Sequence, residues 1–293
     1  MVTIDSVKVG VVFPQTETSS DPGALRAYVE AVESLGYSHL ALYDHVLGAD
    51  PDRPGGLRGP YTDKDPFHEV FVTLGYIAAI TSTIELVTEV LVLPQRQTAL
   101  VAKQAAEVGL LSGGRLRLGV GLGWNQVEFE ALGEEFGNRG RRVEEQVAVM
   151  RRLWTEPVVD FAGEFHVIPR AGLNPMPGRQ IPVWMGGTAG AAKRRVARIA
   201  DGWMMNTPTE KDARGALAEM RQLVADAGRA TQDFGIEVRF GLDDGPEKTA
   251  SDISEWHELG ISHATINTMR GGLAWPDGHV DALRRFSEVY RED

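Results

Sequence analysis

Two adjacent polar residues, Asp44 and His45, follow a short apolar segment at residues 39–43. A strand is predicted for that segment, so both side chains come where a strand ends. The imidazole could reach a bound ring there, and the carboxylate could orient neighbouring groups. An aspartate that caps the chain and a histidine packed in the core explain the same residues equally well. The sequence therefore does not decide between a catalytic and a structural role for Asp44 and His45.

A glycine-rich segment at residues 119–125 could let a ligand approach the backbone closely. Gly121 and Gly123 alternate with apolar residues, and Asn125 ends the segment as a candidate hydrogen-bond partner. A flat heterocycle could lie on such a backbone. The alternative is tight packing within a barrel, which needs the same glycines.

A second candidate site is Gly186-Gly187-Thr188, between a predicted apolar strand and a predicted helix. Free N–H groups at the start of the helix, together with the Thr188 hydroxyl, could bind an anion such as phosphate. A plain turn capped by Thr188 accounts for these residues equally well.

A repeated strand–helix unit determines where these residues lie. Predicted strands cover residues 7–13, 39–43, 84–93, 115–120, 181–185, 203–205, 236–240 and 263–267. Predicted helices cover residues 23–35, 68–80, 98–111, 138–154, 189–200, 210–227, 248–259 and 280–290. Eight such units predict an α/β protein with one (β/α)8 TIM-barrel domain over residues 1–293.

An open doubly wound sheet is the structural alternative, because residues 119–125 resemble a dinucleotide-binding loop. That segment reads G-x-G-x-G rather than G-x-G-x-x-G and follows the fourth strand, which favours the barrel. Two insertions are predicted. A polar loop at residues 48–66 follows strand two and is a candidate lid or a mobile surface loop, and a hairpin at residues 158–167 precedes strand five, turning at Ala162 and Gly163.

Composition excludes several classes of function. The net charge of −11 argues against nucleic-acid binding, and the absence of cysteine excludes disulfides, thiolate nucleophiles and Cys-ligated metals, which is compatible with a cytoplasmic protein. The apolar run that ends at Pro14 is too short to span a membrane. Facing carboxylates, His-rich metal motifs and a suitably placed strand lysine are missing from the predicted strand ends. A rim with few ionisable groups suits an organic cofactor that carries its own reactivity.

Motifs along nearly the whole chain resemble the bacterial luciferase-like monooxygenase superfamily, and most of all its coenzyme F420-dependent oxidoreductases. The matching motifs are YDHV (43–46), VLVLP (90–94), AKQAA (102–106), LSGGRL (111–116), GVGLGWN (119–125), EF (128–129), PVWMGG (182–187) and ADGW (200–203). The resemblance implies a luciferase-like barrel that holds reduced F420, or alternatively FMN, at its strand ends. It also implies a homodimer, because members are often dimers.

The resemblance also implies roles for individual residues. His45 would lie near the reactive face of the ring, and Thr88-Glu89 would match a bulge in strand three that often contains a non-proline cis peptide. The catalytic residues would be His45 and Glu89. The cofactor-binding residues would be Asp44, Thr88, Gly121, Gly123, Asn125, Gly186, Gly187 and Thr188, and no metal is expected.

Two positions depart from the pattern of this superfamily. Position 89 is usually small but is Glu here, so Glu89 is a candidate proton donor or substrate contact. The sugar-phosphate dehydrogenases place an acidic residue where this chain has Leu122, which argues against that reaction. Arg270, after the last strand, is a candidate partner for a cofactor or substrate anion, with a plain surface arginine as the alternative.

Three functions are open at this point. The first is an F420-dependent oxidoreductase that transfers a hydride between the deazaflavin and a small organic substrate. The second is an FMN-dependent monooxygenase that consumes oxygen. The third is a flavin-binding barrel without turnover, against which the polar residues His45 and Glu89 argue.

Overall fold

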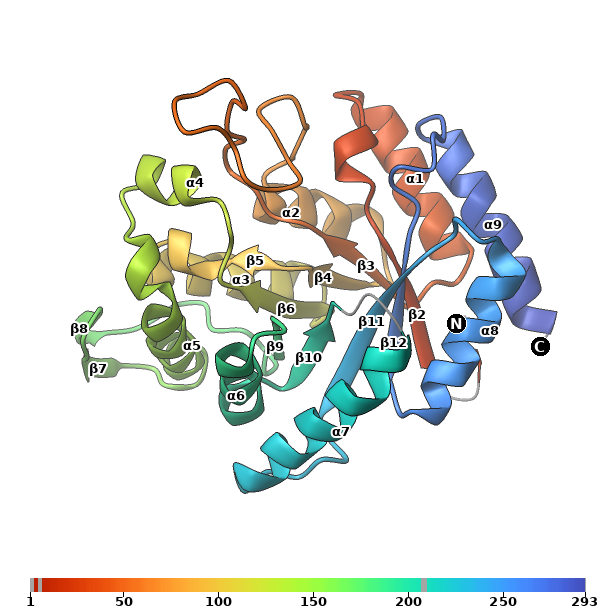
Figure 1. The fold of residues 1–293 in the computed structure, drawn as a ribbon. Helices are drawn as coiled ribbons and strands as arrows, with labels where there is room; N and C mark the ends of the chain where they lie inside the picture. The colour runs from red at the N-terminus through yellow and green to blue at the C-terminus, as the bar shows by residue number, and fades with distance from the viewer. Residues whose placement is uncertain (1–2, 5–6, 207–209, 293) are drawn as a thin grey trace.

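The structure is a computed structural model that describes residues 3–4, 7–206 and 210–292. Within these ranges, eight parallel strands follow one another in chain order around a ring. The first barrel strand pairs with both the second and the last, which closes the ring. Helices surround the strands on the outside (Figure 1). The prediction of a (β/α)8 barrel is confirmed.

The barrel strands are β2 (Val7–Val12), β3 (His39–Leu42), β4 (Glu85–Thr88), β6 (Leu116–Gly121), β9 (Val183–Gly186), β10 (Gly202–Met205), β11 (Gly235–Gly241) and β12 (His263–Asn267). The other strands are β1 (Thr3–Ile4), β5 (Leu91–Val92), β7 (Val159–Ala162) and β8 (Val167–Ala171). The α-helices are α1 (Pro22–Ser34), α2 (Val70–Ile80), α3 (Thr98–Leu111), α4 (Gln126–Ala131), α5 (Arg139–Thr155), α6 (Gly190–Ile199), α7 (Glu210–Asp226), α8 (Pro246–Glu258) and α9 (Asp277–Glu292). Short 3-10 helices cover η1 (Gln15–Glu17), η2 (Leu93–Gln95) and η3 (Phe136–Asn138).

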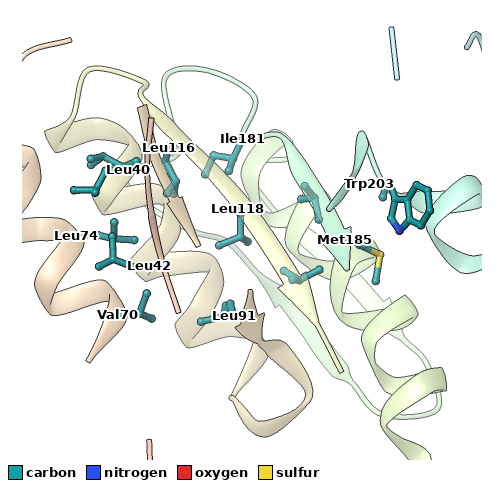
Figure 2. Packing of buried hydrophobic residues seen from close by; sticks show 14 of the residues in the cluster. Leu40, Leu42, Val70, Leu74, Leu91, Leu116, Leu118, Ile181, Met185 and Trp203 are labelled. Atoms are coloured by element: carbon teal, nitrogen blue, oxygen red, sulfur yellow. The ribbon is translucent and has the colours of Figure 1, made fainter. Parts of the chain in front are cut away.

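Alternation along the strands produces two separate apolar regions. Leu40 and Leu42 of β3 belong to the large core between strands and helices, together with Val70 and Leu74 of α2 (Figure 2). Residues that face the opposite way form a small cluster inside the barrel, made of Ala41, Val87, Trp184 and Met204. Successive strand side chains point to opposite faces, so the next inward residues after this cluster lie at the carboxyl ends of the strands.

Three local features differ from the sequence prediction. The third barrel strand was predicted as continuous over residues 84–93, but β4 ends at Thr88 and β5 begins at Leu91. The two residues between them, Glu89 and Val90, form a bulge and are joined by a cis peptide bond, so the bulge lies one residue later than the Thr88-Glu89 position that the family resemblance implied. Helix α4 was not predicted, because six residues are too few to produce a helical period in the sequence.

The two predicted insertions are present. The loop after β3 stands at the same end of the molecule as α4 (Figure 1). The β7–β8 hairpin lies beside α5, outside the helix ring, and its turn is closed by Gly163 N–H donating to His166 O at 2.8 Å. The turn therefore covers residues 163–166 rather than Ala162 and Gly163. None of the described helices combines the length and the hydrophobicity that a membrane-spanning segment needs.

Candidate active site

A cavity of about 470 Å³ lies at the carboxyl ends of the barrel strands. Its volume falls within the range of about 300–1,000 Å³ that is usual for sites of small molecules and cofactors. The residues that line it are Tyr43, Asp44, His45, Pro60, Tyr61, Glu89, Val90, Val92, Gly121, Leu122, Gly123, Trp124, Gly186, Gly187, Ala192, Met204, Met205, Asn206 and Arg239. In (β/α)8 barrels this end carries the active site.

Seven of the ten predicted site residues line this cavity: Asp44, His45, Glu89, Gly121, Gly123, Gly186 and Gly187. The other three lie beside it. Thr88 is buried and donates its hydroxyl proton to Gly119 O at 2.6 Å. Asn125 is buried and its amide donates to Leu47 O at 3.4 Å, whereas Thr188 is exposed between β9 and α6. The structure gives Thr88 and Asn125 contacts within the protein.

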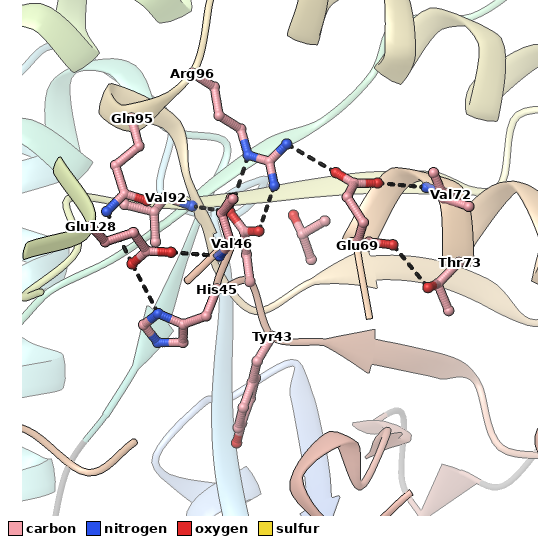
Figure 3. Close-up of polar contacts among 12 residues, drawn as sticks. Tyr43, His45, Val46, Glu69, Val72, Thr73, Val92, Gln95, Arg96 and Glu128 are labelled. Atoms are coloured by element: carbon pink, nitrogen blue, oxygen red, sulfur yellow. Dashed lines mark hydrogen bonds and ion pairs between the residues drawn. The ribbon is translucent and has the colours of Figure 1, made fainter. Parts of the chain in front are cut away.

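His45 is held in a fixed orientation by a carboxylate that the sequence analysis did not single out. Its Nδ1 lies 3.0 Å from Glu128 Oε2 (Figure 3). Its side chain is only 9% exposed. The rings of Tyr61, Phe67 and Trp124 meet the imidazole edge to face, with centroids 4.9–5.4 Å away. A histidine held at Nδ1 and packed on its sides has its remaining nitrogen available for the cavity that it lines.

Glu128, on helix α4, is fully buried and accepts four hydrogen bonds. The donors are His45, the backbone N–H groups of Val46 and Leu47, and the Gln95 amide. Burial opposes ionisation of this carboxyl, but the hydrogen bonds outweigh it and lower its pKa. Glu128 is therefore an anion that orders both the imidazole and the start of the loop after β3.

Asp44 is a structural anchor as well as a cavity residue. It accepts from Arg96 at both carboxylate oxygens, at 2.6 and 3.2 Å, and from the Val92 N–H at 2.9 Å. Arg96 extends this network to Glu69, which caps helix α2. A bidentate arginine–carboxylate pair fixes both partners, so Asp44 holds the end of β3 against the segment that follows the cis bulge.

Glu89, by contrast, has no close partner within the described residues. Its Oε2 is buried without a hydrogen bond, and its Oε1 lies 3.8 Å from Arg239 Nη1. Arg239 donates instead to the Tyr43 hydroxyl at 2.9 Å and to Asn206 Oδ1 at 3.1 Å. The cavity thus contains a buried carboxyl group and a neighbouring guanidinium that are near each other without being bonded.

Burial, and next the negative charge of Glu237, raises the pKa of Glu89 to about 8, although Arg239 and Arg117 act in the opposite direction. Glu237 and Arg117 belong to a charged layer inside the barrel. Arg117 Nη1 lies 2.6 Å from Glu237, Arg117 Nε lies 2.9 Å from Glu85, and Trp184 covers the guanidinium at 4.4 Å. Burial, together with the negative charge that this layer places nearby, therefore favours the protonated form of Glu89 at neutral pH.

The raised pKa of Glu89 predicts a pH-dependent stability. Between its ordinary value of 4.5 and the folded value of about 8, the folded chain retains a proton that the unfolded chain releases. This contribution to stability is fully present below the lower value and is lost as the pH rises through the upper one. Thermal unfolding of wild type and Glu89→Gln, followed by circular dichroism from about pH 5 to about pH 9, measures it.

We expect the wild-type midpoint to fall relative to that of Glu89→Gln across this range, by roughly 2–4 °C for each kcal/mol lost. The comparison cancels the titration of every other group. A difference between the two midpoints that stays constant with pH would show that Glu89 ionises normally.

Glycines at the ends of β6 and β9 flank the side chain of Val90. A Cβ atom built on Gly121 would lie 2.3 Å from Val90 Cγ2, and one built on Gly186 would lie 3.4 Å from Val90 Cγ1. Only glycine leaves space at position 121. The bulge residue and the two glycines together make a smooth apolar wall of the cavity.

The N-terminus of α6 adjoins this wall and presents free donors. Helix α6 starts at Gly190 after Ala189, and no side chain caps it. A Cβ on Gly190 would lie 3.4 Å from Arg194 Nη1, so that guanidinium lies over the first turn of the helix. Backbone N–H groups, the positive end of the helix and an arginine are the elements of an anion site.

The loop after β3 reaches the cavity through Pro60 and Tyr61. Arg270 donates to Pro60 O at 3.4 Å, and its guanidinium lies 6.0 Å from the Tyr61 ring. A Cβ on Gly59 would collide with the Trp124 ring. Arg270 thus contacts the loop and is absent from the cavity lining. Its pairing with a cofactor or substrate anion stays a prediction.

The sequence analysis missed Glu128 as a site residue and gave Tyr43, Arg96, Arg194 and Glu237 no role. For two charged residues a signal existed. Glu237 and Arg239 alternate within a predicted apolar strand, which places both side chains on the inner face of the barrel. Glu128 had no such signal, because it depends on how α4 folds back over β3. No cluster of three or more potential metal ligands was found in the described part of the chain.

Comparison with known proteins identifies the family. The profile of the family described as luciferase-like monooxygenase matches residues 6–285. An uncharacterised protein of Mycobacterium tuberculosis is 35% identical over 232 residues, which cover 77% of this chain and 80% of the relative. An F420-dependent glucose-6-phosphate dehydrogenase of Segniliparus rotundus is 28% identical over 256 residues, which cover 83% of this chain and 71% of the relative.

A solved structure has the same fold. An F420-dependent secondary alcohol dehydrogenase in complex with an F420-acetone adduct superposes with a TM-score of 0.79 at 17% identity, covering 97% of this chain and 98% of that chain. At this identity the likeness concerns the architecture alone. The match of the family profile over nearly the whole chain shows that the protein belongs to the luciferase-like monooxygenase family, a family of oxidoreductases.

Proposed function

We propose that the protein is an F420-dependent oxidoreductase that transfers a hydride between the deazaflavin and a small organic substrate. The observation that carries the proposal is a cavity lined both by a carboxyl group with an oxygen that is buried and unbonded among the described residues and by a wall made of Val90, Gly121 and Gly186. A two-electron carrier that exchanges hydride needs a proton donor or acceptor beside the substrate. Glu89 meets that need. The relative with an F420-dependent activity supports the choice of cofactor.

The residues present fit a flat cofactor with a phosphate. Val90, Gly121 and Gly186 would border the ring, and Gly123 and Asn125 would support the segment that follows. The phosphate would be held by Gly187, Thr188 and the first turn of α6, with Arg194 nearby. When bound, the reduced cofactor supplies a hydride to the substrate.

The protein residues have distinct roles in this proposal. His45, oriented by Glu128, would contact the reacting side of the ring, and Asp44 and Thr88 would hold the bulge in place. Glu89 would donate or accept the substrate proton. The apolar wall and the loop at Pro60 and Tyr61 would exclude water from the reaction. We further propose a cytoplasmic enzyme, active as a homodimer and built as one barrel domain.

An FMN-dependent monooxygenase is the second candidate, because the family includes monooxygenases by its description. A flavin-binding barrel without turnover is the third. A sugar phosphate is not the proposed substrate, since the acidic residue of those dehydrogenases is replaced by Leu122, which lines the cavity. Oxygen consumption during turnover separates the first two functions directly.

Parallel titrations with F420 and FMN, followed by fluorescence quenching of each cofactor, test the proposal. We expect F420 to bind at least about tenfold more tightly than FMN. Gly186→Val should weaken F420 binding at least about tenfold, because its Cβ meets only ordinary contacts at 3.4 and 3.8 Å and its methyl groups would occupy the wall. Gly75→Val is a matched control, since a Cβ on that α2 residue meets nothing within 4 Å. Equal weak binding of both cofactors would refute the cofactor assignment.

A further inference from the structure

The distance between Glu89 and Arg239 is unusually long for two opposite charges that line the same cavity. Charge-assisted N–H···O bonds are about 2.7–2.9 Å long, and Arg117 and Glu237 in the same barrel meet at 2.6 Å. Glu89 and Arg239 remain 3.8 Å apart, with one carboxyl oxygen buried and unbonded. The two groups therefore do not form a hydrogen-bonded ion pair with each other.

A third polar group completes the arrangement. The Tyr43 hydroxyl accepts a hydrogen bond from Arg239 Nη1, and its own proton has no acceptor among the described residues. Burial raises the pKa of Tyr43, so this hydroxyl keeps its proton. Arg239 is held at its other nitrogen by Asn206 and is 31% exposed in the cavity. Donors from the residue after β3, from β11 and from the cis bulge thus converge on one side of the site.

We propose that Arg239, Tyr43 and Glu89 form a binding site for one substrate oxygen atom that becomes negatively charged during the reaction. A separation of 3.8 Å lets one oxygen atom lie within hydrogen-bond distance of both Arg239 and Glu89. The substrate class that such a site recognises is a carbonyl compound, a ketone, an aldehyde or a conjugated enone, without a permanent charge at that oxygen. This inference rests on the proposed function for its hydride.

The step balances for a simple ketone. The hydride adds to the carbonyl carbon and forms a C–H bond, while the electron pair of the C=O π bond moves to oxygen. Arg239 and Tyr43 stabilise that oxygen, and Glu89 transfers its proton to it, which forms the O–H bond of the alcohol. The substrate is reduced by two electrons and the cofactor is oxidised by two. The Glu89 carboxylate then regains a proton from water, and the reverse steps oxidise an alcohol.

The charges around Glu89 suit this role. The surrounding groups are Tyr43 directly after β3, Tyr61 in the loop that follows, Arg117 on β6, and Glu237 and Arg239 on β11. When Glu89 is protonated, the positive charge of Arg239 is available to an oxygen anion. When Glu89 is ionised, it repels such an anion. Anion binding should therefore weaken as the pH rises through the Glu89 pKa of about 8.

Binding of 4-nitrophenol to the cofactor-free protein tests the site without turnover. Its phenolate form is yellow and its neutral form is not, so absorbance reports which form is bound. At about pH 6, below the Glu89 pKa, we expect binding to produce the phenolate signal. Arg239→Met should weaken phenolate binding about 10–100-fold, since it removes a hydrogen bond from a charged donor. Arg26→Met removes an exposed cation of α1 and should leave binding unchanged.

Glu89→Gln separates this site from a general electrostatic effect. The amide is a permanent neutral donor, so we expect phenolate binding within about threefold of wild type at pH 6 and no loss at pH 9, where wild-type binding falls at least about tenfold. Tyr43→Phe, which should weaken binding about three- to tenfold, serves as a second variant if Arg239→Met does not fold by circular dichroism.

Absence of phenolate binding to wild type, preferential binding of the neutral phenol, or equal affinity in Arg239→Met would overturn the inference. The same pH dependence in wild type and Glu89→Gln would overturn it too. Failure of F420 to bind, in the separate titration, would refute the proposed function and leave the phenolate result intact. The two failures are therefore distinguishable.

Discussion

Replacement of Glu89 by glutamine is expected to slow reduction of a carbonyl substrate by reduced F420 about 10²–10⁴-fold, the usual contribution of a positioned general acid. The amide preserves the shape of the side chain and the neutral charge that Glu89 has below its pKa, but it has no acidic proton to transfer. The affinity for F420 should stay within about twofold. Absorbance of oxidised F420 formed with cyclohexanone or cyclohex-2-enone provides the rate.

The pH profile supports the same assignment. Because the protonated carboxyl is the active form, wild-type kcat/KM for reduction should be constant below a pH of about 8 and fall about tenfold per pH unit above it. The kcat/KM of Glu89→Gln should not show this fall at high pH. If Glu89→Gln retains more than half of the wild-type rate and the same profile, the proton comes from another group.

Replacement of His45 by alanine is expected to reduce F420-dependent turnover at least about 100-fold. The imidazole lines the cavity, is fixed by Glu128 and fills the space between three aromatic rings. Its removal takes away a contact to the reacting side of the cofactor and allows water to enter. Two separate measurements distinguish a loss of turnover from a loss of cofactor binding. They are the rate at saturating cofactor and the dissociation constant of F420.

His166→Ala is the matched control, because His166 lies in the turn of the β7–β8 hairpin, pairs with Glu145 of α5 at 2.7 Å and does not line the cavity. It should leave turnover unchanged. A His45→Ala protein that binds F420 and turns over at the wild-type rate would show that His45 has a structural role only.

Much of the barrel could be predicted from the sequence, because each strand is an apolar segment and each long helix has a helical period. Helix α3 was predicted with both observed ends, since Thr98 opens it and Ser112 with the following glycines ends it. The break between β4 and β5 could not be read from the strand pattern, because Val90 resumes the apolar run directly after Glu89 and a single polar residue does not end a strand pattern. The family resemblance supplied the bulge instead.

Some site residues could be predicted from the sequence, and others could not. Residues at strand ends, such as His45 and Gly186, could be placed from the order of strands alone. The partner of His45 could not, because Glu128 lies 83 positions away and reaches it only through the fold of α4. The unbonded state of Glu89 likewise depends on where Arg239 directs its hydrogen bonds. Contacts between distant segments are set by tertiary packing and leave no local pattern.

A crystal structure of the protein with F420 tests the central claim most directly. The account predicts that the deazaflavin lies in the cavity against Val90, Gly121 and Gly186, with its phosphate at the start of α6 and the Glu89 carboxyl facing the substrate side. F420 bound outside this cavity, or a cavity left empty at a saturating concentration of F420, would contradict it.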